Sequence, residues 1–146
     1  MCANSLDDLD NWLNYDWVGA SWGPDKRGGG NGGLSLRKVS SIIKVLKHQT
    51  RLDDTELEDW WLTDRLVDLI GADIANGTES LAFSVEQHWH DSPMGFHTGH
   101  SGGALAHGTW GTKTKRDHIY AYCPEVKITL DMDLGTFIPK TCHEEW

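Results

Sequence analysis

The chain has 146 residues, of which 38% are hydrophobic, and its formal charge is −9, from 22 acidic and 13 basic residues. This length fits one domain with its own core, and no apolar run approaches the length of a membrane span. The negative charge argues against nonspecific binding to a phosphate backbone, so we expect no nucleic-acid partner.

The processing signals in the sequence are weak. Cys2, Cys123 and Cys142 lack the spacing of a metal site, so they allow at most one disulfide and leave one thiol over. Asn76-Gly77-Thr78 matches the acceptor pattern for N-glycosylation, which matters only for a chain that enters the secretory route. The chain begins without a basic and then apolar leader, so nothing in it predicts a signal peptide or an anchor.

The first predicted elements are a short helix and a strand. Ser5 precedes apolar residues at positions 6, 9, 12 and 13, a spacing that predicts a short amphipathic helix. Tyr15 to Ala20 predicts a strand, and Pro24 with the glycines that follow it predicts a surface loop over residues 21–30.

The stretch from Gly28 to Arg37 reads GGGNGGLSLR. Because glycine lacks a Cβ, such a run lets the backbone approach a ligand closely. Leu34 and Leu36 then alternate with polar residues, which predicts a strand over residues 33–37. The alternative is a flexible linker that runs into a strand.

Two helices are predicted next. Over residues 38–47, apolar residues at positions 39, 42, 43 and 46 form one face, opposite the lysines. In the second helix Thr55 is the expected cap and Glu58 stands three residues on, as in a capping box, and Gly71 ends the helix. The expected buried side of the second helix consists of Leu57, Trp60, Trp61, Leu66, Leu69 and Ile70.

The acidic pair Glu58 and Asp59 follows the glycine run by about twenty residues, and a carboxylate can serve as a base. Capping of the helix is the alternative role for Glu58. Asp59 lies at the expected start of a helix and is followed by two tryptophans, so it is the better candidate for a general base. The glycine run and the acidic pair together indicate a small-molecule transferase site.

A histidine-rich part follows a strand predicted over Leu81 to Glu86. His88 and His90 would share one strand face, and imidazoles at this spacing can hold zinc or manganese. An exposed polar loop is the alternative, and it is favoured for His100 and His107. His97 differs because the apolar segment Pro93-Met94-Gly95-Phe96 leads to it.

Further strands are predicted over residues 118–122 and 126–130, followed by a tail. Asp131 and Asp133 have the spacing of a divalent-ion pair, but a solvated strand end explains them better. Eight tryptophans fit either an aromatic core or a site that stacks on sugars or bases.

Five segments in this order, YDWVGASW, GGGNGGLSLR, ELEDWW, LAFSVE and PMGFH, resemble the family called domain of unknown function 5672, whose members resemble glycosyltransferases of the GT-A type. The resemblance covers about Cys2 to His97. It implies an α/β fold, namely part of a GT-A-like mixed sheet flanked by helices, over residues 1–100. Residues 101–146 are then a C-terminal extension.

The resemblance also implies roles for particular residues. Glu58 and Asp59 supply the acid that contacts or deprotonates an acceptor hydroxyl, and His97 joins the shell of a divalent metal, Mn²⁺ or Mg²⁺. The residues expected to line the nucleotide-sugar donor and acceptor sites are Gly29, Gly30, Asn31, Gly32, Gly33, Arg37 and Trp60.

By the same resemblance, a strand ending in a metal-binding acidic motif should precede Cys2, so we expect the domain to be N-terminally incomplete in this chain. The family also makes the secretory pathway a plausible location. Two other functions remain open. One is a sugar-binding module or inactive transferase fragment, with Trp22, Trp60 and Trp61 as stacking platforms. The other is a zinc module that needs His88 and His90.

Overall fold

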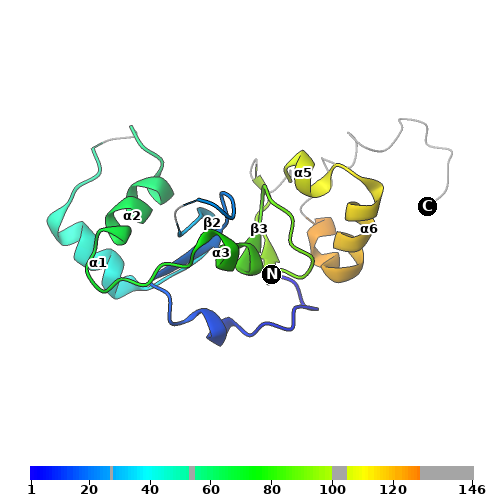
Figure 1. The fold of residues 1–146 in the computed structure, drawn as a ribbon, viewed down its shortest axis with the longest axis horizontal. Coiled ribbons are helices and arrows are strands. Elements are labelled where there is room, and N and C mark those ends of the chain that lie inside the picture. Colours follow the sequence, from blue (N-terminus) through cyan, green and yellow to red (C-terminus); the bar gives the residue numbers. More distant parts are fainter. Residues whose placement is uncertain (27, 53–54, 100–104, 129–146) are drawn as a thin grey trace.

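The structure is a computed structural model that describes residues 1–26, 28–52, 55–99 and 105–128 (Figure 1). This part of the chain contains five α-helices, two short 3-10 helices and two separate two-stranded sheets, so the predicted α/β class is confirmed. The elements in chain order are η1 (Leu9–Trp12), β1 (Trp17–Ala20), β2 (Asn31–Arg37), α1 (Val39–His48), α2 (Glu58–Val67), α3 (Gly77–Phe83), β3 (Ser84–Val85), β4 (Gly95–Phe96), α5 (His107–Trp110), α6 (Lys113–Tyr122) and η2 (Pro124–Ile128).

The strands form two small sheets in place of the predicted mixed sheet. β1 and β2 are antiparallel, with Trp17 opposite Arg37, and the register shifts between Gly19 and Ala20. β3 and β4 form a separate parallel pair. In Figure 1, α1 and α2 lie at one end of the molecule, α5 and α6 at the other, and the strands with α3 lie between them.

The helix predicted over residues 38–47 is confirmed as α1, but of the predicted apolar face only Ile42 packs against the core. Ser41 and Val45 are the buried residues of α1, whereas Val39 is 69% exposed. The reason is a contact that periodicity does not reveal, because the Ser41 hydroxyl donates a hydrogen bond to Oδ1 of the buried Asp16.

Asp16 joins three segments at the start of β1. Besides the Ser41 bond, its Oδ2 accepts the N–H of Asp73 at 2.7 Å, and Lys38 Nζ lies 3.8 Å from Oδ1. Burial raises the pKa of Asp16, but the hydrogen bonds from Ser41 and Asp73, together with the positive charges of Lys38 and Lys44, outweigh burial and lower this pKa overall.

The capping box predicted at Thr55 does not form. α2 begins at Glu58 after Leu57, which gives no side-chain cap, and the Thr55 hydroxyl donates to the carbonyl of Leu52 at 2.9 Å. The capping box lies instead at α3, where Asn76 Oδ1 accepts the N–H groups of Thr78 and Glu79 and the Glu79 carboxylate accepts the N–H of Asn76. Asn76 of the glycosylation pattern therefore caps a helix.

Two predicted strands are helical. Residues 81–83 of the expected strand Leu81 to Glu86 belong to α3, so only Ser84 and Val85 remain extended. The strand expected over residues 118–122 lies within α6, which begins because the Thr112 hydroxyl accepts the N–H of Lys115. Residues 126–128 belong to η2, and positions 129 and 130 lie outside the described residues. The N-terminal helix is reduced to the 3-10 turn η1.

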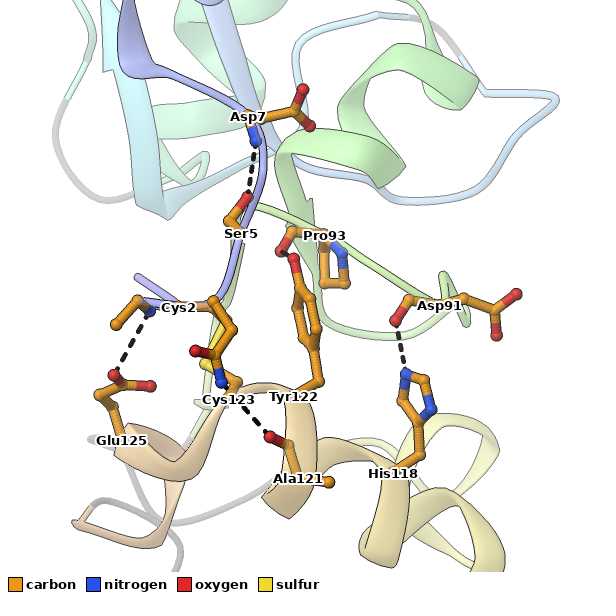
Figure 2. Close-up of a disulfide and its surroundings, with 12 residues drawn as sticks. Cys2, Ser5, Asp7, Asp91, Pro93, His118, Ala121, Tyr122, Cys123 and Glu125 are labelled. Atoms are coloured by element: carbon orange, nitrogen blue, oxygen red, sulfur yellow. Dashed lines mark hydrogen bonds between the residues drawn. A yellow bond between two sulfur atoms is a disulfide. The ribbon is translucent and has the colours of Figure 1, made fainter.

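A disulfide joins Cys2 to Cys123 and ties the N-terminus to the end of α6 (Figure 2). Both cysteines belong to a core in which Val85 and Phe96 from the strand pair meet residues of the C-terminal helices. Tyr122 adds a further tie, because its hydroxyl donates to the carbonyl of Pro93 at 2.8 Å. Cys142 lies outside the described residues.

None of the helices in the described ranges has the length and hydropathy to cross a membrane.

Candidate functional site

Two glycines of the run, Gly29 and Gly30, are packed against neighbouring elements, whereas Gly32 and Gly33 contact other candidate residues. Gly29 and Gly30 are buried at φ 101° and 92°, which favours glycine, and a Cβ on Gly29 would lie 2.8 Å from the Thr63 side chain. A Cβ on Gly30 would overlap the backbone carbonyl of Ala20. These two glycines therefore serve the packing of β1, β2 and α2, whereas Gly32 and Gly33 contact the acid and the histidine predicted for the site.

Asp59 meets Gly32 at the beginning of α2. The Gly32 N–H donates to Oδ2 of Asp59 at 3.1 Å, and the Trp60 N–H donates to Oδ1 at 2.8 Å. The residue is 8% exposed, and it lies in the first turn of α2, where the helix dipole favours a negative charge. Each oxygen thus has one fixed N–H donor, which holds the carboxylate in one orientation.

Glu58 is ion-paired with Arg37. The Arg37 Nη2 lies 2.8 Å from Glu58 Oε1 and also donates to the carbonyl of Gly32 at 3.2 Å. The guanidinium lies over the Trp17 ring, 4.0 Å from its centroid. This network holds β2 to the start of α2, so a structural role accounts for both charged residues.

His97 lies against the other glycine of the pair. A Cβ on Gly33 would overlap Nε2 of His97, so only glycine leaves room for the ring in this position. The Gly33 N–H is held by Asn31 Oδ1 at 2.8 Å. The Nδ1 of His97 lies 3.3 Å from Oε1 of Glu86. Asp59 and His97, predicted from two separate stretches, therefore contact neighbouring residues of β2, Asp59 at the Gly32 N–H and His97 at Gly33.

Two tryptophans stack on each other, and one of them, Trp60, directly follows Asp59 in the chain. The rings of Trp22 and Trp60 lie 4.9 Å apart between centroids, at an interplanar angle of 28°. Trp60 is 54% exposed, so it offers aromatic surface to a ligand. Trp61, the third expected platform, is 4% exposed and belongs to the core with Trp17 and Val45, so it does not offer one.

The other candidate metal ligands that the structure describes do not form a common site. Within the described ranges, no three side chains of histidine, cysteine, aspartate or glutamate converge on one point. His88 lies near Gly23 in space, His90 Nδ1 accepts the N–H of Ser92, and neither is in a strand. His107 begins α5. His100, Asp131 and Asp133 lie outside the described residues.

Glu86 is the site residue that the sequence interpretation missed. It follows Val85, the last residue of β3. In the sequence, the only hint of its role is that it is the single charged residue directly after the largely apolar run LAFSV. A glutamate in that place is equally typical of an exposed strand end, so its contact with His97 required the tertiary structure.

The model of the family described as "Protein of unknown function (DUF5672)" matches residues 1–97, the part of the chain that contains every residue of the candidate site. This is the family that the sequence motifs resembled. No curated protein and no solved structure matches the chain.

Proposed function

We propose that this chain, which belongs to the family of proteins of unknown function DUF5672, transfers a sugar from a nucleotide-sugar donor to an acceptor hydroxyl. The observation that carries the proposal is the meeting of Asp59 and His97 at two adjacent glycines. A base for the acceptor and a ligand for a diphosphate-bound cation are needed close together in such a transfer.

Asp59 is the proposed general base. Its two oxygens each accept one backbone N–H, and a carboxylate oxygen has a further lone pair with which to accept a hydroxyl. As the acceptor oxygen bonds to the anomeric carbon, Asp59 takes the hydroxyl proton. The bond from that carbon to the diphosphate breaks, and the diphosphate leaves with the electron pair. This course inverts the anomeric configuration.

A divalent cation fits the site only with ligands from outside the described chain. His97 offers an imidazole, a donor that manganese accepts, but the described residues supply no group of three ligands. The remaining ligands would be diphosphate oxygens and water. A bound cation would neutralise charge on the departing diphosphate.

Trp60 is the proposed acceptor platform. Its ring stacks on that of Trp22, yet Trp60 is still 54% exposed. In the sequence, Trp60 directly follows Asp59. Aromatic rings bind apolar surface at low entropic cost, and the apolar face of a sugar ring offers such a surface. We therefore favour a carbohydrate acceptor for this position.

The experiment that tests the proposal is ligand-observed NMR of the purified chain against a panel of nucleotide sugars, with and without manganese. We expect one donor to bind only with manganese, and His97→Ala to abolish this binding. His88→Ala is the matched control, since the structure places His88 in a loop away from the Gly33 contact. A folded chain that binds no donor under either condition would contradict the proposal for this chain.

The exposed Trp60 also favours a second function, a sugar-binding module without catalysis. That function predicts binding of oligosaccharides that is weakened by Trp60→Ala, without binding of any nucleotide sugar. Product formation from a donor and an acceptor would exclude it.

A further inference from the structure

Glu86 and His97 leave the carboxyl ends of two paired parallel strands. Val85 of β3 pairs with Phe96 of β4, so the residue after each strand emerges at the same edge. The backbone fixes this arrangement further, because the His97 N–H donates to the carbonyl of Val85 at 2.8 Å. In α/β proteins this edge is where ligand-binding groups gather.

The two side chains form a partly buried polar pair. Their exposed fractions are 17% for His97 and 16% for Glu86, and Nδ1 lies 3.3 Å from Oε1. The atoms Nδ1 of His97 and Oε2 of Glu86 are buried, and neither has an aligned hydrogen bond within the described part of the chain. Leaving such groups unpaired costs free energy, and at 3.3 Å the Glu86 carboxylate lies within hydrogen-bond reach of Nδ1.

The tautomer of the imidazole decides what His97 can bind. A neutral imidazole has one N–H and one lone pair, and a carboxylate beside Nδ1 favours the proton there. Nε2, the nitrogen next to Gly33, then carries the lone pair. Histidines that bind metals commonly donate their other N–H to a carboxylate in this way.

We propose that Glu86 is a positioning residue, which holds the proton of His97 on Nδ1 and so presents the lone pair of Nε2 at Gly33 to a divalent cation. The inference deepens the proposed function, because it rests on His97 as the cation ligand. Glu86 itself need not touch the cation or the sugar.

Two residues of the C-terminal helices donate hydrogen bonds to the backbone near Glu86 and His97. The hydroxyl of Thr109, a fully buried residue of α5, donates to the backbone carbonyl of Glu86 at 3.1 Å. Tyr122 of α6 binds the carbonyl of Pro93 ahead of β4. The backbone on both sides of the pair is therefore held by residues that lie beyond the family match at residues 1–97.

The test is a long-range ¹H–¹⁵N NMR spectrum of the histidine rings at about pH 8, where imidazole is neutral. His97→Gln identifies the His97 signals. We expect Nδ1 to be protonated in the natural chain, Glu86→Ala to move the proton largely to Nε2, and Glu86→Gln to keep it on Nδ1, because the amide oxygen still accepts. Glu56→Ala, a surface carboxylate paired with Arg65, should change nothing.

A proton on Nε2 in the natural chain, or a tautomer that Glu86→Ala leaves unchanged in a folded protein, would overturn the inference. If Glu86→Ala does not fold, the natural chain and Glu86→Gln still decide it. Manganese-dependent donor binding should fall about 10- to 100-fold in Glu86→Ala and less in Glu86→Gln. Because the tautomer is read without any nucleotide sugar, a failure of donor binding in all variants contradicts the proposed function and not this inference.

Discussion

The backbone N–H of Gly32 points at Oδ2 of Asp59 across 3.1 Å, which joins the glycine run to the start of α2 at a single carboxylate. If Asp59 is the base, Asp59→Asn should lower transfer about 100- to 10,000-fold while donor binding persists, because the amide cannot take a proton. Initial rates and a donor titration measure the two effects. Asp68→Asn, at the exposed end of α2, is the matched control. Equal rates in Asp59→Asn and the natural chain would refute the base assignment.

Gly33→Ala tests whether His97 needs the space beside that glycine. The new Cβ would overlap Nε2, so the ring must move, and manganese-dependent donor binding should be lost while the fold persists. Gly108→Ala is the control, because a Cβ there meets only the Gln87 carbonyl at 3.4 Å, an ordinary contact. The same donor titration measures both variants, and unchanged binding by Gly33→Ala would show that the ring position does not matter.

The capping box of α3 predicts a loss of stability in Asn76→Ala. Its side chain accepts two backbone N–H groups, so its removal should lower the free energy of unfolding by about 1 kcal/mol. Urea unfolding followed by circular dichroism measures the change. Asn14→Ala, an exposed asparagine in a turn, should stay within about 0.5 kcal/mol of the natural chain.

Asp16 predicts an acid-sensitive fold. Its pKa is lowered in the folded chain, so the folded state holds the proton less tightly than the unfolded state does. The stabilisation is present above the unfolded pKa of about 3.9 and is lost as the pH falls through the folded pKa.

Ser41→Ala removes a hydrogen bond that lowers this pKa, so stability should depend less steeply on pH below about 4. Ser40→Ala, on the exposed neighbour, should keep the natural slope. Urea unfolding at a series of pH values measures both slopes. If the two variants give the same slope, the Ser41 bond is not the cause of the lowered pKa.

The disulfide predicts a large effect on stability. Replacing Cys2 and Cys123 together by serine should lower the free energy of unfolding by about 2–5 kcal/mol, because the bond restricts the unfolded chain. Cys142→Ser leaves this bond in place and controls for the loss of a cysteine. A double variant as stable as the control would mean that the bond contributes nothing to the fold.

Local patterns predicted β1, β2, α1 and the position of α2, because turn residues and apolar spacing are strong there. They failed at residues 81–83 and 118–122, where short apolar runs fit the period of a strand and that of a helix equally well. In both places the helix starts at a capping residue earlier in the chain, Asn76 for α3 and Thr112 for α6. The Ser41 to Asp16 bond and the Arg37 to Glu58 ion pair join residues 21 or more positions apart, so no local pattern reveals them. Asp59 was predicted from its place at the start of a helix and His97 as a metal ligand from the family resemblance, whereas Glu86 required the fold.

The family match ends at His97, but the hydrophobic core around the β3–β4 pair continues into the C-terminal helices. Leu105, Ile119 and Val126 cover Val85 and Phe96, the apolar residues that precede Glu86 and His97. A protein shortened to the matched residues would expose this apolar surface and lose the covalent tie at Cys2. The C-terminal helices therefore belong to the same hydrophobic core as the two strands that carry Glu86 and His97.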